Sequence, residues 1–249
     1  MLIKHGGNPD LVRWYHNLLQ ERRLRMTLQE EELELYTGVG FPQGGVASAK
    51  FWLIAFDMAI RIINKNLIEG NGYADDCSAL IGGNNGNNMV RRMQRTLDQL
   101  TSWGKTCGLR FNPEKTVVVF FSRSKKTPTL HLKMDGKVLP YTDSAVYLGV
   151  TLDRKMHWQT HINNKLQKAK RRLMQISNTT RHTWGPRPKL MKWSYTGVTR
   201  TVMGYGAYVW AHDIDYPGTR KKLDRLNRMA LCSFTKFKRS VPTLSLIHI

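Results

Sequence analysis

Two adjacent aspartates in the first half of the chain, Asp75 and Asp76, lie in a segment that few structures can accommodate. Tyr73 and Ala74 precede them, apolar residues follow, and a glycine- and asparagine-rich run then breaks the chain. This pattern predicts a hairpin with the aspartates at its tip. Adjacent like charges are costly unless a cation neutralises them, and Mg²⁺ prefers carboxylates together with substrate phosphates. The segment indicates half of a metal site for phosphoryl transfer, although an Asp-Asp surface turn is the simpler explanation of these residues alone.

Charge divides the chain into two unlike parts. The formal net charge of +21 predicts a polyanionic partner, most simply nucleic acid, with an anionic membrane surface as the weaker alternative. Residues 1–153 carry 19 Lys and Arg against 15 Asp and Glu, a net +4, whereas residues 154–249 carry 20 against 3, a net +17. We therefore expect a domain boundary near residue 153, with the carboxylates before it and the nucleic-acid-binding surface after it.

The cysteines and the hydropathy of the chain indicate where in the cell the protein is located. The three cysteines, Cys77, Cys107 and Cys232, form neither a metal-spaced cluster nor an even set for disulfides. We expect a reducing, intracellular location, nucleus or cytoplasm, for a protein that is not secreted. The apolar stretch Phe51–Ile63 contains Asp57 and Arg61 and is too short to span a bilayer, so no membrane partner is expected.

Periodicity and breaker residues predict the elements before residue 153. Asn8-Pro9-Asp10 is typical of a helix start, and a glycine-rich loop at residues 38–45 precedes a largely buried helix. With the later segments, a strand–helix–strand arrangement surrounds the acidic hairpin. The expected elements are helices from Asn8 to about Met26, Ser48 to Ile60 and Asn87 to about Trp103, a strand from Val117 to Phe121, and a hairpin turning at Asp135-Gly136.

After residue 153 the pattern becomes that of basic helices. Trp158, Ile162, Leu166 and Leu173 recur at three- and four-residue steps, and most lysines and arginines lie off that stripe. Two further helices are predicted at Leu190–Trp210 and Thr219–Phe234. Residues 244–249 look like a translated sequencing adapter and are interpreted as a non-native tail, the alternative being an ordinary apolar strand.

Taken in order, these segments resemble the reverse transcriptases of non-LTR (LINE-type) retrotransposons, nearest the Jockey- and R1-like groups. The order and spacing of the motifs carry the resemblance more than any single one. The matching segments are Phe41–Ser48 (motif B), Tyr73–Asp76 (motif C), Leu109–Thr116 (motif D), Tyr147–Asp153 with Trp158 and His161-Ile162 (motif E and the entry to the thumb), and Tyr205–Trp210.

The resemblance implies an α+β fold. A partial polymerase palm, a ferredoxin-like sheet with packed helices, would occupy residues 1–153, and a basic, all-helical, thumb-like region would occupy residues 154–243. It also implies an RNA-directed DNA polymerase that uses Mg²⁺ or Mn²⁺ in a two-metal mechanism, with RNA template, DNA primer and dNTPs as partners. The oligomeric state stays open.

The resemblance also assigns roles to residues. Asp75 and Asp76 would bind metal and act in catalysis, and Lys115 would stand on the pyrophosphate side, unless it is simply a solvated lysine after a turn. Tyr73 would lie near the template–primer end. Pro42, Gln43, Gly44 and Gly45 would line the nascent base pair and template, Leu148 and Gly149 would form the primer grip, and Lys165, Lys168, Arg171 and Arg172 would hold duplex phosphates.

Three departures from the family pattern qualify this interpretation. No segment in residues 1–37 resembles the aspartate-bearing motif A, which we expect upstream of Met1, and Asp10 at a helix start is a poor substitute. Ala49 stands where the family has proline, and Gly70-Asn71-Gly72 replaces β-branched residues and should weaken that strand. These departures suggest a truncated, degenerating copy. The alternative function is therefore a catalytically inactive remnant that only binds nucleic acid, and a metal-dependent nuclease is disfavoured.

Overall fold

The computed structural model describes residues 3, 6–20, 22–28, 31–38, 40–122, 131–178, 184–235 and 240–241. The chain forms two compact units: the first comprises Met1–Thr116 and Pro128–Pro140, and the second comprises Val117–Thr127 and Tyr141–Ile249. The chain thus passes between the units after residues 116, 127 and 140. The boundary near residue 153, expected from the charge pattern, stays a prediction. The predicted tail at residues 244–249 lies outside the described residues.

Helices and small antiparallel sheets together build both units, so the fold class is α+β. The strands of the described residues pair only two by two, in the order of the sequence. A continuous ferredoxin-like sheet is therefore not formed within the described part of the chain, because each hairpin pairs only with itself. The hairpins are β1(Arg22–Leu28)–β2(Glu31–Thr37), β3(Glu69–Tyr73)–β4(Asp76–Leu80), β5(Lys133–Met134)–β6(Lys137–Val138) and β7(Ser144–Tyr147)–β8(Val150–Asp153).

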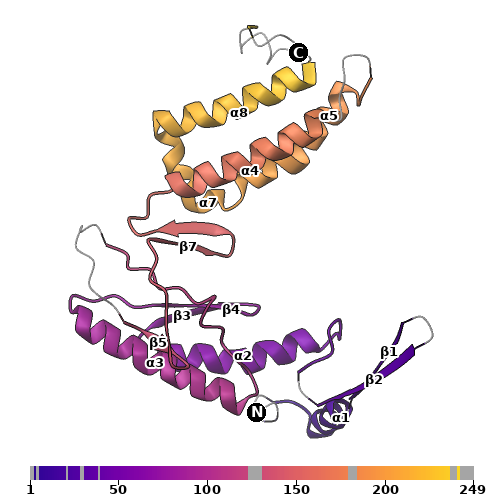
Figure 1. Ribbon diagram of the computed structural model, residues 1–249, viewed down its shortest axis with the longest axis vertical. Helices are drawn as coiled ribbons and strands as arrows, with labels where there is room; N and C mark the ends of the chain where they lie inside the picture. The colour runs from indigo at the N-terminus through magenta and orange to yellow at the C-terminus, as the bar shows by residue number, and fades with distance from the viewer. Residues whose placement is uncertain are drawn as a thin grey trace. The chain divides into compact units, whose positions relative to one another are not determined.

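The core of the first unit lies between two long helices and the β3–β4 hairpin (Figure 1). α2(Ser48–Lys65) and α3(Gly86–Thr106) are amphipathic and pack against each other, and α2 also packs on β3. Both helices were predicted, although α2 runs one turn further than the expected end at Ile60. The buried core residues are Phe56, Ala59, Ile63, Ile68 and Leu100.

The N-terminal helix ends earlier than predicted. Asn8 caps α1(Pro9–Leu19) as expected, with its side chain accepting from the amides of Asp10 and Leu11. The predicted continuation to Met26 is wrong, because residues 22–28 form β1, in which apolar and basic residues alternate. The arginines pair across the hairpin: Arg25 donates to Glu34 Oε1 at 2.8 Å, which the two-residue period of a strand allows and a helix does not.

Two predicted strand regions have different outcomes. The hairpin at Asp135-Gly136 is confirmed, with both turn residues at positive φ as a two-residue turn requires. Residues 117–121 make only one isolated bridge, Val118 with Tyr141, so the predicted strand Val117–Phe121 is wrong. β-branched residues extend the backbone there, but no neighbouring strand pairs with the segment.

The second unit is a helical bundle with the β7–β8 hairpin attached (Figure 1). The basic helices α4(Gln159–Asn178) and α8(Pro217–Thr235) confirm the predicted periodicity, and they pack against each other. The predicted helix Leu190–Trp210 is confirmed as far as Gly204, because α5(Pro188–Ser194), a π-helical turn (Tyr195–Thr199) and α6(Arg200–Gly204) follow one another without a break. Its last part is wrong: after Tyr205 and Gly206 the chain continues as a separate helix, α7(Ala207–Trp210), and a 3-10 turn (Ala211–Asp215). Gly206, at φ 68°, lies in the left-handed region between α6 and α7 and interrupts the helix. The buried core residues include Trp158, Ile162, Leu173, Met191, Trp210 and Leu226.

Within the described part of the chain, no helix combines the length and apolar character needed to cross a membrane.

Candidate active site

The acidic hairpin has its two aspartates at the tip, as predicted. Tyr73 at the end of β3 pairs with Asp76 at the start of β4, leaving Ala74 and Asp75 as a two-residue turn. Both aspartates are exposed, and neither forms an ion pair with another described residue. Tyr73 is 66% exposed beside Asp76. The turn therefore presents two neighbouring, uncompensated carboxylates to solvent.

The backbone of this turn is fixed from α2. Ala74 has a φ of 52°, a left-handed conformation that is unfavourable for a residue with a Cβ. The indole nitrogen of Trp52 on α2 donates a 2.7 Å hydrogen bond to the Ala74 carbonyl, and Trp52 itself stacks on Phe56. A strained turn persists where its surroundings determine it. Trp52 thus holds the peptide that carries Asp75.

Two glycines let the hairpin approach α2 closely. A Cβ on Gly72 would lie 2.7 Å from Cε1 of Phe56 and 3.0 Å from Cδ1 of Ile60, and a Cβ on Gly70 would lie 2.9 Å from Ile63. The sequence interpretation of Gly70-Asn71-Gly72 as a weakened strand missed this packing role. β-branched residues at these positions would push the acidic turn away from Trp52.

Cys77 follows the aspartates on the side of β4 that faces α2. Burial raises the pKa of its thiol, and the neighbouring charge of Asp76 raises it further. The thiol is therefore neutral at physiological pH and packs with the first unit's core.

The glycine loop forms a tight turn that leads into α2. The Gly45 amide donates to the Pro42 carbonyl at 3.1 Å, and Gly44 has a φ of 84°, as a type II turn requires at its third position. The Ser48 hydroxyl donates to the same Pro42 carbonyl at 2.8 Å. Gln43 at the corner of the turn is exposed. The loop thus offers a rigid backbone and one free polar side chain.

Lys115 lies in a loop fixed by its neighbours. Asn112 accepts the Glu114 amide with its side chain at 2.9 Å, and its carbonyl accepts the Thr116 amide and hydroxyl. Glu114 pairs with Lys137 at 3.0 Å, while the exposed Lys115 makes no ion pair with a described carboxylate. No hydrogen bond or ion pair joins Lys115 to Asp75 or Asp76, so the structure orders its loop without bringing it into contact with the acidic turn.

The described residues supply only part of a metal site. No group of three His, Cys, Asp or Glu side chains comes together in the described part of the chain. Asp57 on α2 pairs with Arg61 at 2.6 Å, so its carboxylate stabilises the surface of the helix. Asp75 and Asp76 fit one or two carboxylate ligands of Mg²⁺, whose remaining ligands are characteristically water and substrate phosphate.

In the second unit, Leu148 and Gly149 form the two-residue turn between β7 and β8. Both have positive φ, 47° and 75°. The Tyr205 hydroxyl donates a 2.7 Å hydrogen bond to the Leu148 carbonyl, and a Cβ on Gly149 would lie 3.1 Å from the Tyr205 ring. The predicted primer-grip residues are therefore exposed at a turn that is held from the α6–α7 corner.

The predicted basic residues of α4 divide into two groups. The side chains of Lys165, Lys168 and Arg171 line one cavity with Gly149. Arg172 donates instead to Gln175 at 3.1 Å and does not line the cavity. Sequence periodicity placed all four off the apolar stripe but could not separate them.

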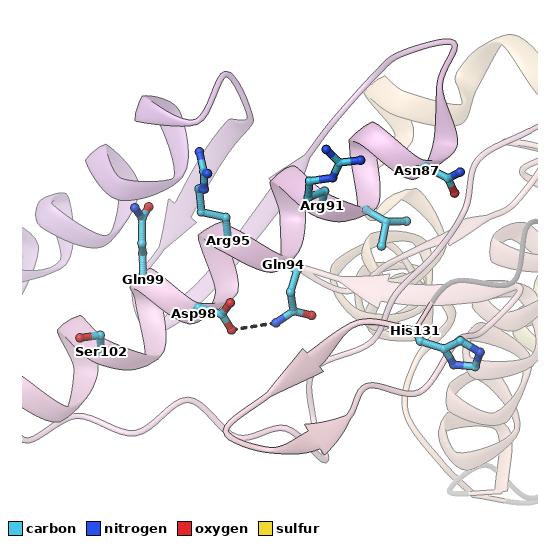
Figure 2. A pocket seen from close by; sticks show the side chains of 9 residues that line it. Asn87, Arg91, Gln94, Arg95, Asp98, Gln99, Ser102 and His131 are labelled. Atoms are coloured by element: carbon cyan, nitrogen blue, oxygen red, sulfur yellow. Dashed lines mark hydrogen bonds between the residues drawn. The ribbon is translucent and has the colours of Figure 1, made fainter.

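A second, larger groove of about 680 Å³ runs along α3. Figure 2 shows Arg91, Arg95 and Gln99 on one side of the helix, and Gln94 and Asp98 on the side facing β5. Gln94 donates to Asp98 and to the Lys133 carbonyl, both at 2.8 Å. The polar groups on that side of the groove therefore already bind each other and β5. None of the predicted site residues lines it.

Sequence reasoning missed Trp52 and Tyr205 as residues that hold the two turns. Trp52 lies in the helix Ser48–Ile60, which was predicted only to be largely buried, and Tyr205 begins the segment Tyr205–Trp210, which was noted only for its resemblance to the family. Their hydrogen-bond acceptors lie 22 and 57 positions away in the chain. The one available signal was a non-glycine residue, Ala74 or Leu148, at a turn position that usually requires positive φ.

Comparison with known proteins identifies the family. The profile described as reverse transcriptase (RNA-dependent DNA polymerase) matches residues 4–152, more than half of the chain. The chain belongs to this family. No solved structure matches it.

Relatives from insect retrotransposons extend the likeness. The chain is 24% identical over 241 residues to a 115 kDa protein of the type-1 retrotransposable element R1DM of Drosophila melanogaster, covering 96% of this chain and 23% of the relative. It is 26% identical over 215 residues to the RNA-directed DNA polymerase from mobile element jockey of the same fly, covering 81% and 23%. It is 22% identical over 212 residues to a Pol polyprotein from element R1 of Nasonia vitripennis, covering 82% and 62%. The predicted resemblance to R1- and jockey-type reverse transcriptases is thus confirmed, and the chain spans less than two thirds of each relative.

Proposed function

We propose that this chain supplies the palm and thumb parts of an RNA-directed DNA polymerase of a non-LTR retrotransposon. The observation that carries the proposal is the turn at Asp75: two exposed, uncompensated carboxylates on a backbone fixed by Trp52. Fixed carboxylates at a hairpin tip suit a reaction in which positioning and charge neutralisation supply most of the catalysis. Family membership supports the same reaction.

Asp75 and Asp76 are the residues that would hold Mg²⁺, or Mn²⁺ in its place. When bound, the metal activates the primer hydroxyl and neutralises charge on the leaving pyrophosphate. The exposed Lys115 ammonium, in a loop ordered by Asn112, is available to a departing phosphate group as a cation or proton donor. dNTPs are the substrates that this arrangement suits.

Template and primer would be held by the remaining predicted residues. Tyr73 and the Pro42–Gly45 turn expose an aromatic ring, a glutamine side chain and close-approach glycines, which suit contact with a base pair. Leu148 and Gly149 would contact the primer, and the basic helices after residue 153 would hold RNA–DNA duplex through its phosphates. The net charge of +17 over residues 154–249 supports binding without sequence readout.

Nucleic-acid binding is tested first, with the full chain and a labelled RNA–DNA duplex in fluorescence anisotropy. If about six phosphates are contacted, affinity should fall about a thousandfold between about 50 and 200 mM salt, and scrambling the sequence should change it little. Absence of binding at low salt, or a flat salt dependence, would contradict the proposal.

Catalysis is tested in a chimera. We expect no dNTP incorporation by the 249-residue chain alone with Mg²⁺ or Mn²⁺, because its described residues bring no third carboxylate to Asp75 and Asp76. In the chimera, this chain replaces the matching segment of the jockey polymerase. We expect the chimera to extend a primer on an RNA template. Asp75→Asn should lower that extension at least about a thousandfold, since it removes charge stabilisation at the reacting phosphate. Extension at the unsubstituted rate would show that Asp75 is not catalytic.

A second candidate function is nucleic-acid binding without catalysis. The charge of the second unit favours it, as does the lack of a third metal ligand in the described part of the chain. The chimera separates the two functions. A chimera that folds and binds duplex, but never extends a primer, would support the binding function alone.

A further inference from the structure

One face of the β1–β2 hairpin consists of apolar side chains that are open to solvent. Successive residues of a strand point to opposite faces, and the register pairs Leu24 with Leu35 and Met26 with Leu33 on the same face, with Leu28 next along it. These five side chains are between 50% and 75% exposed. A contiguous exposed apolar surface of this kind marks an interaction site.

The opposite face of the hairpin is polar and already paired within the hairpin. Arg25 donates to Glu34 at 2.8 Å, and Arg23 lies 3.9 Å from the same carboxylate and 5.5 Å from the centre of the Tyr36 ring. β1 and β2 pair with no other described strand. A two-stranded hairpin is marginally stable in water unless its apolar face is covered. The apolar face therefore needs a partner, whereas the polar face does not.

The two ends of the apolar face carry opposite charges. Arg22 lies on this face at the open end of the hairpin, where its guanidinium donates to the Gly40 carbonyl at 2.8 Å. Glu31 lies on the same face at the closed end, opposite Leu28, and forms no ion pair with another described residue. The two charged ends stand about 20 Å apart at the rise of a β-strand.

A face with this pattern is complementary to itself. When a second hairpin is turned antiparallel, about a two-fold axis, the central apolar pairs pack on each other and Arg22 of each copy lies opposite Glu31 of the other. A parallel arrangement would place like charges together. Residues 22–37 carry 3 Arg against 4 Glu, a net −1, on a chain of +21. Two copies therefore repel each other less through this segment than through the basic remainder of the chain.

We propose that the apolar face of the β1–β2 hairpin binds the same face of a second copy of this chain, in an antiparallel, two-fold arrangement. Two sheets packed face to face lie about 10 Å apart, which lets leucine and methionine side chains interdigitate. Five apolar side chains are far fewer than the about 20–30 residues a side of a standard interface, so the dimer is weak. The inference does not rest on the proposed function.

Sedimentation equilibrium of the full chain, freed of nucleic acid and studied from about 1 to about 200 µM, tests the proposal at the concentrations that a weak interface requires. Met26→Thr should raise the dimer dissociation constant at least about tenfold, because threonine suits a strand but loses apolar burial in both copies. The control is Tyr36→Thr on the opposite face, since Met26 and Tyr36 are 63% and 65% exposed. It should change the constant less than about twofold. Circular dichroism should show that both variants fold.

Charge exchange at the ends of the face tests the antiparallel arrangement. Glu31→Arg and Arg22→Glu each place like charges opposite each other in their own dimers, so each variant should dimerise at least about fivefold more weakly. Mixed in equal amounts, the two variants should form a heterodimer as stable as the original dimer, because every end contact again joins opposite charges. Glu32→Arg on the opposite face is the control and should not restore dimerisation when mixed with Arg22→Glu.

Salt tests the same end contact without a substitution at Arg22. Because screening weakens like-charge repulsion, the loss in Glu31→Arg should become smaller as the salt concentration rises. A loss that stays the same at every salt concentration would mean that Glu31 does not face a positive charge of the second copy, and it would overturn the antiparallel arrangement.

The remaining outcomes are equally decisive. A chain that stays monomeric at about 200 µM would overturn the proposal, as would equal effects of Met26→Thr and Tyr36→Thr. Self-association that the mixture of folded charge variants does not restore would overturn the two-fold contact. A monomeric chain whose hairpin amides become protected from deuterium exchange only in the chimera with the jockey polymerase would assign the face to a segment of the longer protein. None of these results changes what is expected for duplex binding or primer extension.

Discussion

Two hairpin turns, one in each unit, are stabilised by the same kind of hydrogen bond. Each turn begins with a non-glycine residue in the left-handed region, Ala74 at φ 52° and Leu148 at φ 47°. In each, the carbonyl of that residue accepts a 2.7 Å hydrogen bond from a helical or helix-flanking aromatic side chain, the indole of Trp52 or the hydroxyl of Tyr205. An aromatic donor fixed by packing compensates a strained backbone and leaves the neighbouring side chains exposed.

The two turns differ in what they present. The first carries Asp75 and Asp76, which no described cation neutralises, and the second lies beside Lys165 and Lys168, which no described carboxylate neutralises. Asp75, Asp76 and Lys168 are exposed to water, so an ion of opposite charge can reach both places. The comparison therefore makes these two rigid turns with uncompensated charge the places to test for the proposed metal and phosphate binding.

The largest loss of stability should follow when a side chain fills the space between the acidic hairpin and α2. Gly72→Val should lower the free energy of unfolding by about 3 kcal/mol, because its Cβ would meet the Phe56 ring at 2.7 Å. Urea unfolding followed by tryptophan fluorescence measures this. The matched control is Gly82→Ala, whose Cβ would meet nothing within 4 Å. Equal stability of the two variants would show that α2 does not hold the hairpin as described.

An intermediate effect is expected from removing each aromatic donor. Trp52→Phe and Tyr205→Phe should each lower the free energy of unfolding by about 1 kcal/mol, the net value of one hydrogen bond, with Trp52→Phe losing more because the smaller ring also packs less. The controls are Trp193→Phe and Tyr208→Phe, whose side chains are 72% and 101% exposed. If either donor variant had the same free energy of unfolding as its control, the two turns would not be stabilised in the same way.

The smallest effect should be a pH dependence of the second unit that comes from His161. Burial lowers the pKa of His161, the Tyr205 backbone opposes that shift, and the charge of Lys165 adds to it. Because the folded pKa is below the usual value near 6.5, the unfolded chain takes up a proton first. Stability should therefore be complete above about pH 6.5 and fall as pH drops toward the folded pKa.

Melting temperatures across this range measure the dependence, and His161→Gln should flatten it while lowering stability throughout. Gln retains an acceptor for the Thr151 amide but cannot titrate. An unchanged pH profile in His161→Gln would mean that another group controls the acid side of the stability curve.

The sequence predicted the parts of this site that depend on local pattern. The acidic tip followed from Tyr73 and Ala74 before the aspartates, the apolar residues after them, and the glycine and asparagine run after Ile81, all within a few residues of the turn. α4 followed from one apolar stripe. Trp52 and Tyr205 could not be predicted, because a hydrogen bond to a distant carbonyl depends on how helices pack and leaves no periodic trace in the sequence.

The errors have physical causes in particular residues. The capping signal at Asn8 was real, but no glycine marks the end of α1, and the alternation from Arg22 to Leu28 was read as helix. Gly70 and Gly72 were interpreted as weakening a strand, although they make room for α2. Gly206 interrupts an otherwise helical apolar pattern, because its positive φ is incompatible with a continuous right-handed helix.

The most direct test of the central account is to locate a bound metal on the full chain. Mn²⁺ titrated to about millimolar concentration, a range typical of weak carboxylate sites, should broaden the backbone amide signals of residues 73–77 first in ¹H–¹⁵N spectra. Asp75→Asn with Asp76→Asn should abolish that broadening, while Asp224→Asn on α8 should leave it intact. Broadening that persists in the double variant, or begins elsewhere in the chain, would contradict the assignment of the acidic turn as a metal site.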